Sequence, residues 1–150
     1  MVIIKTQITN ITSSICQAIV AGILIKNKFS LSDYNKPKIN SYRTKLQKLL
    51  DLLEEIIGKY KEDWAAEVSW TYPKGGFFVS LKVPFEFGRD QVVECVNMYG
   101  IILCPMQFFY QDSGGEKEIR LAFSNLSYEV MEKGINKLQK YLKHKIVNEA

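Results

Sequence analysis

Residues 68–83 read VSWTYPKGGFFVSLKV, and this stretch decides the fold because the spacing of the apolar residues changes there. Residues before it repeat apolar side chains every three or four positions, the period of an amphipathic helix. Residues 68–72 predict a first strand, and Pro-Lys-Gly-Gly at 73–76 predicts the turn after it. Residues 77–83 then alternate apolar and other side chains, which is the two-residue period of a second strand. The apolar set of that strand is Phe77, Val79, Leu81 and Val83.

Two helices are predicted upstream of this stretch. The first runs to about residue 27, with Ser14 and Gln17 at the spacing of a capping box. Its apolar stripe consists of Ile15, Ile19 and Ile23. The second is predicted over residues 38–62, where leucine and isoleucine recur at helical spacing, and it would be about 36 Å long. A helix of that length in a short chain is expected to pack along more than its own domain.

Four further elements are predicted downstream. Residues 89–99 favour a short helix closed by Gly100, and residues 101–104 favour a short buried strand. Residues 118–123 alternate again and predict the last strand, after which Ser127 caps a final helix. The apolar face of that helix consists of Met131, Ile135, Leu138 and Leu142. The predicted order is α-α-β-β-α-β-β-α, an α+β fold in which a small sheet of about four strands is covered by helices.

The 150 residues fit one domain, with a helical part at 1–62 and an α/β part at 63–150. Apolar residues make up 47% and charged residues 24%, which excludes a disordered or fibrous chain. The net charge of +4 is too small to indicate a nucleic-acid partner. Every apolar run is far shorter than a membrane span, so no membrane association is expected.

The cysteines and the histidine indicate no metal or disulfide chemistry. Three cysteines are an odd number and form no Cys-x-x-Cys pair, which favours a reducing cytoplasm over a disulfide scaffold or zinc site. Cys16, Cys95 and Cys104 lie in apolar runs and are expected to be buried. His144 is the only histidine, and its lysine-rich surroundings predict a solvated surface position.

Arg120 is the strongest candidate for a binding residue. It lies in the middle of the strand predicted over 118–123, on the face opposite Ile119 and Leu121, and its neighbour on that face is the small Ala122. An arginine placed in this way can offer its planar fork to a carboxylate in two parallel hydrogen bonds. The alternative is an ordinary solvent-facing arginine, paired with Glu118 or with an acid on a helix.

Two other motifs have a weaker functional signal. Gly75 and Gly76 allow a close approach of backbone or ligand, but a plain hairpin turn explains them as well. The stretch 9–14 offers hydroxyls and backbone N–H groups at a helix N-terminus, where a phosphate can bind. Helix capping alone also accounts for those residues.

Several fragments follow one another in a recognisable order. They are Trp70-x-x-Pro73-x-Gly75-Gly76-x-Phe78, GIILCP at 100–105, Phe108-Phe109, a glycine loop, IRLAFS at 119–124, and Glu129-x₄-Gly134-Ile135-x-x-Leu138. Together they resemble the C-terminal segment of the class I/II aminotransferases, the fold-type I enzymes that use pyridoxal phosphate. Residues 9–17 resemble the stretch before the long interdomain helix of that family. The Pro-Met-x-Phe-Phe-Tyr form at 105–110 is most similar to the branch of dihydroxyphenylglycine aminotransferase and capreomycidine synthase.

The resemblance implies a site and a cofactor. It implies that Arg120 binds the substrate α-carboxylate and that Phe78 lies by the substrate pocket. Thr9 or Asn10 would approach the cofactor phosphate of the neighbouring subunit in a homodimer. Pyridoxal phosphate would be the cofactor of the assembled enzyme, with none bound by this chain alone, and the substrates would be amino acids and 2-oxo acids.

One departure from the family concerns the Schiff-base lysine, which lies in a Ser-x-x-Lys-like segment of the large domain that would precede residue 1. Lys5 follows Met-Val-Ile-Ile and lacks that context. The family's aspartate for the pyridine nitrogen and its ring-stacking aromatic belong to the same large domain.

We therefore expect the small domain of a truncated or split aminotransferase, inactive alone and served by a partner chain carrying the large domain. The alternative is a catalytically silent interaction module derived from that fold, with the long helix docked on a partner.

Overall fold

The computed structural model describes residues 13–148, and Thr9 and Asn10 lie outside the described residues. The chain forms two compact units, residues 1–40 and residues 41–150. Helix α3 (Ser32–Ile56) begins in the first unit and continues into the second. The single domain expected from the sequence stays a prediction.

Helix α2 (Ser14–Lys26) is the first described element, and its N-cap differs by one residue from the predicted capping box. The Ser13 hydroxyl accepts a hydrogen bond from the Cys16 backbone N–H at 3.4 Å, so Ser13 and not Ser14 caps the helix. None of the helix residues is buried. The residues of the predicted apolar stripe lie in this helix but face no core among the described residues, and Ile15 is 73% exposed.

The long helix is shifted toward the N-terminus compared with the predicted range 38–62. It spans Ser32–Ile56 and continues through Pro37 in its second turn. It ends before Gly58, where a short 3₁₀ turn, η1 (Gly58–Tyr60), takes over. Glycine is a poor helix former, so the helix ends here although the apolar spacing continues to Tyr60. The buried side chains of α3 are Leu49, Leu52 and Leu53.

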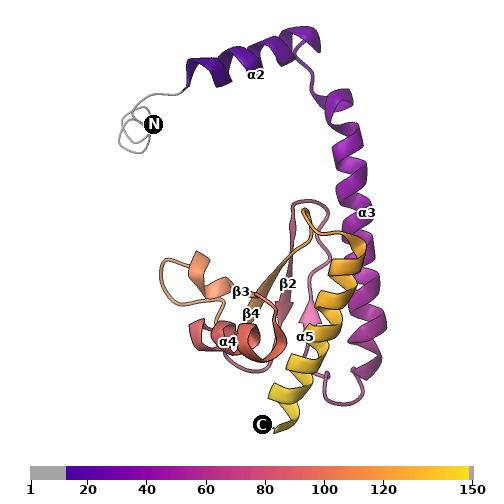
Figure 1. Cartoon of the computed structure of the whole chain (residues 1–150), viewed down its shortest axis with the longest axis vertical. Helices are drawn as coiled ribbons and strands as arrows, with labels where there is room; N and C mark the ends of the chain where they lie inside the picture. Colours follow the sequence, from indigo (N-terminus) through magenta and orange to yellow (C-terminus); the bar gives the residue numbers. More distant parts are fainter. Residues whose placement is uncertain (1–12, 149–150) are drawn as a thin grey trace. The chain divides into compact units, whose positions relative to one another are not determined.

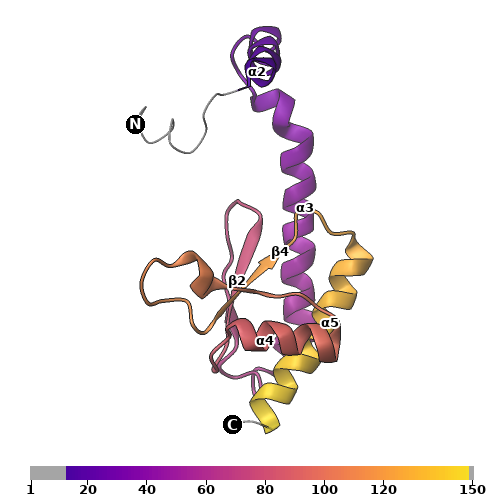
Figure 2. The same ribbon diagram turned by 60° about the vertical axis from the view of Figure 1, so that its left-hand side comes forward.

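A four-stranded antiparallel sheet has the strand order β1-β2-β4-β3. The strands are β1 (Ser69–Trp70), β2 (Phe78–Lys82), β3 (Cys104–Pro105) and β4 (Glu118–Ala122). Figure 1 shows β2 and β4 side by side, with α5 next to the C-terminal part of α3. Figure 2 shows the same pairing of α3 and α5 from a second direction. The predicted α+β class and the order of helices and strands are confirmed.

Helix α5 (Tyr128–Asn148) covers the sheet with one apolar face. Its predicted cap is confirmed, because the Ser127 hydroxyl accepts a hydrogen bond from the Val130 backbone N–H at 3.3 Å. The buried side chains of the helix are Met131, Ile135, Leu138, Tyr141 and Leu142. They pack against the inward side chains of the strands, among them Val79, Leu81, Ile119 and Leu121.

Two side-chain predictions for the strands were wrong. Phe77 was expected on the buried face of β2, but it is 45% exposed and its ring contacts the edge of the Tyr42 ring. Residues 101–104 were expected to form a buried strand, but β3 begins only at Cys104 and Ile102 is 84% exposed. A short apolar run has no periodicity that would say which side chains face inward.

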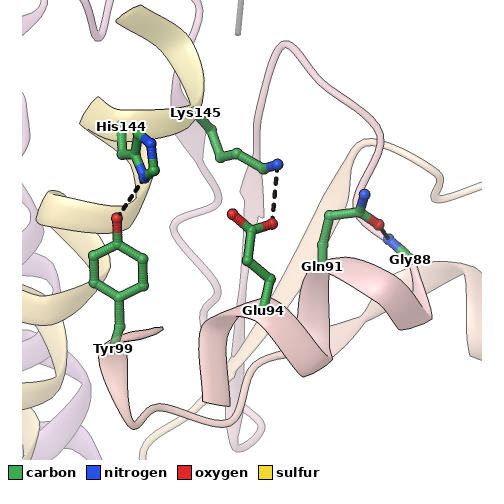
Figure 3. A network of polar contacts seen from close by, with 6 residues as sticks. All are labelled: Gly88, Gln91, Glu94, Tyr99, His144 and Lys145. Atoms are coloured by element: carbon green, nitrogen blue, oxygen red, sulfur yellow. Dashed lines mark hydrogen bonds and ion pairs between the residues drawn. The ribbon is translucent and has the colours of Figure 1, made fainter. Parts of the chain in front are cut away.

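The predicted helix over 89–99 divides into α4 (Arg89–Glu94) and a π-helical turn, η2 (Cys95–Tyr99). Gly100 ends it with φ of 62°, the left-handed conformation that glycine adopts without steric cost. At the other end, the Gln91 side chain accepts a hydrogen bond from the Gly88 backbone N–H at 2.9 Å (Figure 3).

A polar network connects α4 and η2 to α5 (Figure 3). The Tyr99 hydroxyl lies 2.7 Å from Nδ1 of His144, and Lys145 Nζ lies 2.9 Å from a carboxylate oxygen of Glu94. His144 is half-buried in this network, so the predicted solvated surface position was wrong. Its tyrosine partner comes from a distant segment, which the residues around His144 do not reveal.

The three cysteines differ in exposure. Cys95 is buried as predicted, whereas Cys16 is exposed and Cys104 is half-buried. Burial raises the pKa of the Cys95 thiol to about 11. Among the helices of residues 13–148, none combines the length and apolar character needed to cross a membrane.

Candidate functional site

Arg120 lies at the centre of the sheet. Its Cα is paired with Ser80 of β2 on one side and with Cys104 of β3 on the other. Its neighbours Ile119 and Leu121 are buried in the core, while Arg120 itself is half-buried. The alternation of β4 therefore directs the guanidinium away from the core, as the sequence predicted.

Two aromatic rings contact the Arg120 guanidinium. Its central carbon lies 4.2 Å from the centroid of the Phe78 ring and 3.9 Å from that of the Phe109 ring. Phe78 belongs to β2, and Phe109 ends a 3₁₀ turn, η3 (Met106–Phe109), that follows β3. The rings thus come from β2 and from the turn that follows β3, on the two sides of β4. Such cation–π contacts hold an arginine side chain in place without neutralising its charge.

No acidic side chain neutralises Arg120 within the part of the chain that the structure describes. The nearest acid along β4 is Glu118, which accepts a hydrogen bond from the Ser80 hydroxyl at 2.8 Å. The ion pair with Glu118, which an ordinary surface arginine would favour, is therefore not formed. Among the described residues, the guanidinium contacts two aromatic rings and forms no ion pair.

An apolar cavity of about 360 Å³ lies beside this strand. It is bounded by α5, by the 101–104 segment and by residues of β4, and Arg120 is the charged residue of its lining. The lining includes buried α5 residues such as Met131 and Ile135 and does not include Phe78 or Phe109, the two rings that contact the guanidinium.

Sequence reasoning placed Phe78 and Arg120 in one site, and the structure brings them together. It missed the contact of Phe109, although Phe108-Phe109 is one of the fragments that resemble the aminotransferases. Gly75 and Gly76 lie in the β1–β2 connection, where an added Cβ would meet nothing within 4 Å, so the geometry fits a turn. Thr9 and Asn10 lie outside the described residues, and their cofactor role stays a prediction.

Known proteins share this segment and its arrangement. No protein-family model matches the chain. The (S)-3,5-dihydroxyphenylglycine transaminase of Amycolatopsis orientalis is 36% identical over 135 residues, covering 90% of this chain and 30% of the relative. The chain is related to the C-terminal segment of the fold-type I aminotransferases. A second aminotransferase, the 2-aminoadipate transaminase of Thermus thermophilus, is 29% identical over 102 residues, covering 68% of this chain and 24% of the relative.

Solved aminotransferase structures have the same fold over this segment. The multiple substrate aminotransferase from Thermococcus profundus superposes with a TM-score of 0.77 and 25% identity, covering 97% of this chain and 34% of its own. The alpha-aminoadipate aminotransferase from Thermus thermophilus superposes with a TM-score of 0.70 and 26% identity, covering 89% and 32%. The chain therefore spans about a third of the length of these aminotransferases.

The aminotransferase family uses pyridoxal phosphate, which needs a lysine amine for its aldehyde. The groups that contact Arg120 are the two phenylalanine rings, and neither supplies an amine. A guanidinium between aromatic rings has the chemistry to bind a carboxylate, whereas the aldehyde of the cofactor needs an amine. Among the described residues, Arg120 and its two rings form a cationic site with no amine beside it.

Proposed function

We propose that this chain supplies the substrate-carboxylate site of an aminotransferase, with Arg120 as the binding group and Phe78 beside it. The observation that supports this proposal is the position of Arg120. Its guanidinium lies against two aromatic rings at the centre of the sheet and has no acidic partner in the described residues.

The chemistry of transamination gives such a site its use. Both the amino acid and the 2-oxo acid of each half-reaction carry an α-carboxylate, so one arginine serves every substrate. A planar guanidinium binds a carboxylate through two parallel hydrogen bonds, which fixes orientation as well as position. Arg120 would thus orient the substrate for a reaction that other residues carry out.

The catalytic lysine would come from a segment that corresponds to the remaining two thirds of the relatives. Pyridoxal phosphate, bound there, would supply the electron sink of the reaction. Assembly as a homo-oligomer, a partner chain with the large domain, and a cytoplasmic location belong to the same proposal.

Binding of glutarate, a probe with two carboxylates, tests the role of Arg120. We expect Arg120→Ala to weaken glutarate binding about 10- to 100-fold, because charge-assisted hydrogen bonds are lost. Arg89→Ala is the matched control, since it removes the same charge from the first turn of α4. An affinity that Arg120→Ala leaves unchanged would contradict the proposed role.

Native mass spectrometry of the protein purified from its own cells tests the assembly. Borohydride reduction before the measurement would convert a lysine–pyridoxal bond into a stable adduct. A complex that contains this adduct would support an aminotransferase in which Arg120 and Phe78 bind the substrate. A species without any adduct would contradict a working aminotransferase.

A second candidate is a protein-interaction module, and helix α2 favours it. No residue of α2 is buried, and large apolar side chains such as Ile15, Ile19 and Ile25 are 73%, 58% and 65% exposed. A helix that is apolar on all sides is normally covered by other protein. In this function α2 would dock on a partner, and the face of Arg120 would be idle.

Size-exclusion chromatography with light scattering distinguishes the two functions. If α2 mediates association, the double substitution Ile19→Ser and Ile25→Ser should reduce the assembled mass or release a bound partner. Val147→Ser, at the exposed end of α5, is the control for a general loss of apolar surface. Unchanged assembly in the double variant would argue against the docking function of α2.

A further inference from the structure

Phe109 makes the shorter of the two ring contacts to Arg120, although it belongs to no core. Its ring centroid lies 3.9 Å from the guanidinium carbon, and its side chain is 53% exposed. An aromatic side chain that remains half in solvent gains little from burial. The neighbouring Phe108 is similarly exposed, at 58%, but does not contact the cation. The contact with Arg120 therefore distinguishes Phe109 from Phe108.

The fold holds Phe109 in place through the turn that carries it. Gly115 has φ of 72° and lies against the 106–107 peptide of η3. An added Cβ at Gly115 would meet the Tyr110 ring at 2.8 Å, Gln107 N at 2.9 Å and Met106 C at 3.0 Å, so the two segments pack with no room for a side chain. The Gln107 side chain also reaches the Phe87 carbonyl oxygen at 3.5 Å. The position of the Phe109 ring is thus set by packed backbone and not by a free loop.

We infer that Phe109 is a positioning residue for Arg120, which orients the guanidinium plane for an incoming carboxylate. This inference rests on the proposed carboxylate-binding function of Arg120. Rings from β2 and from η3 contact the guanidinium, so a ligand reaches it at the N–H edge. A carboxylate that arrives at this edge can accept two parallel hydrogen bonds, which is the strongest geometry for this pair.

A stacked arginine also loses less freedom on binding than a mobile one. A free arginine side chain samples many rotamers, and a ligand must select one of them. With Phe78 and Phe109 in contact, the guanidinium is already held before the ligand arrives. Removing one ring should therefore weaken binding without removing the charge.

The first experiment measures the guanidinium itself by NMR on the full-length chain labelled with ¹⁵N. The Arg120 Nε–H signal, assigned by its loss in Arg120→Lys, should be shifted by the ring currents of both rings. Phe109→Leu should move this signal toward the position of a free arginine, and Phe108→Leu should leave it unchanged. An Arg120 signal that does not respond to Phe109→Leu would overturn the inference, whether or not glutarate binds.

The second experiment measures glutarate binding in the same variants. Phe109→Leu should weaken glutarate binding about two- to tenfold, as expected for one lost cation–π contact. Phe109→Tyr, which keeps a ring, should restore the affinity, and Phe108→Leu should not change it. Equal losses in Phe108→Leu and Phe109→Leu, or no rescue by Phe109→Tyr, would overturn the inference. If the unmodified chain binds no glutarate, the proposed function fails, and the NMR result still decides the role of Phe109.

Discussion

The Ser80 hydroxyl donates a hydrogen bond to Glu118 Oε2 over 2.8 Å, on the sheet face that also carries Arg120. Glu118 and Arg120 are two residues apart in β4, so their side chains project from the same face. The serine therefore engages the acid that would otherwise compete for the arginine.

Replacing Ser80 by alanine tests this arrangement. In Ser80→Ala, Glu118 loses its partner and can turn toward Arg120, which should weaken glutarate binding by about threefold, the range of an exposed ion pair. Glutarate titrations followed by NMR would measure the change. The double variant Ser80→Ala with Glu118→Gln should recover the original affinity. If the double variant binds as weakly as Ser80→Ala, Glu118 is not the competitor.

The hydrogen bond between Tyr99 and His144 should stabilise the attachment of the π-helical turn to α5. Tyr99→Phe keeps the ring and removes the hydroxyl, so we expect the free energy of unfolding to fall by about 0.5–1.5 kcal/mol. Urea denaturation would measure it. Tyr72→Phe is the control, because the Tyr72 hydroxyl bonds to Glu54 in an exposed position. Its effect should stay within about 0.5 kcal/mol, and equal losses in both variants would contradict the role given to Tyr99.

The buried Cys95 thiol should make stability depend on alkaline pH. Burial raises its pKa from 9.0 to about 11. Between these values the unfolded chain loses the thiol proton while the folded chain keeps it, so the free energy of unfolding falls as pH rises. The slope from this group is at most about 1.4 kcal/mol per pH unit, and the group adds no pH dependence well below pH 9.

Urea denaturation between pH 7 and pH 10.5 would measure this dependence. Cys95→Ala should be less stable at neutral pH, but its stability should fall less steeply at alkaline pH than that of the unmodified chain. Cys16→Ala changes an exposed thiol and should leave the slope unchanged. Identical slopes in Cys95→Ala and the unmodified chain would argue against the raised pKa.

Gly115 should be intolerant of any side chain. Gly115→Ala places a methyl group against the 106–107 peptide in a backbone conformation that favours glycine. We expect a loss of about 1–3 kcal/mol in the free energy of unfolding, together with displacement of the Phe109 ring from Arg120. Thermal unfolding and the Arg120 Nε–H signal would report the two effects. Gly75→Ala has open space around its Cβ and should change neither.

Periodicity predicted much of this fold. The change from helical to strand spacing at residues 68–83 indicated the order of the helices and strands, and the sheet has the expected four strands. The caps of α5 and of η2 followed from Ser127 and Gly100. Less regular segments were harder to predict: the long helix begins six residues before the predicted start, and most of the 101–104 run does not pair.

The sequence by itself determined the α+β class and the direction of Arg120 away from the core. It also determined the likeness of the chain to the aminotransferase motifs. All three depend on the spacing of residues along the chain. Only the tertiary structure decided which distant groups meet. Phe78 reaches Arg120 from β2 and Phe109 reaches it from the turn after β3, while Tyr99 reaches His144 from another helix. Such contacts depend on strand order and on the packing of turns. No local pattern of residues encodes those two properties.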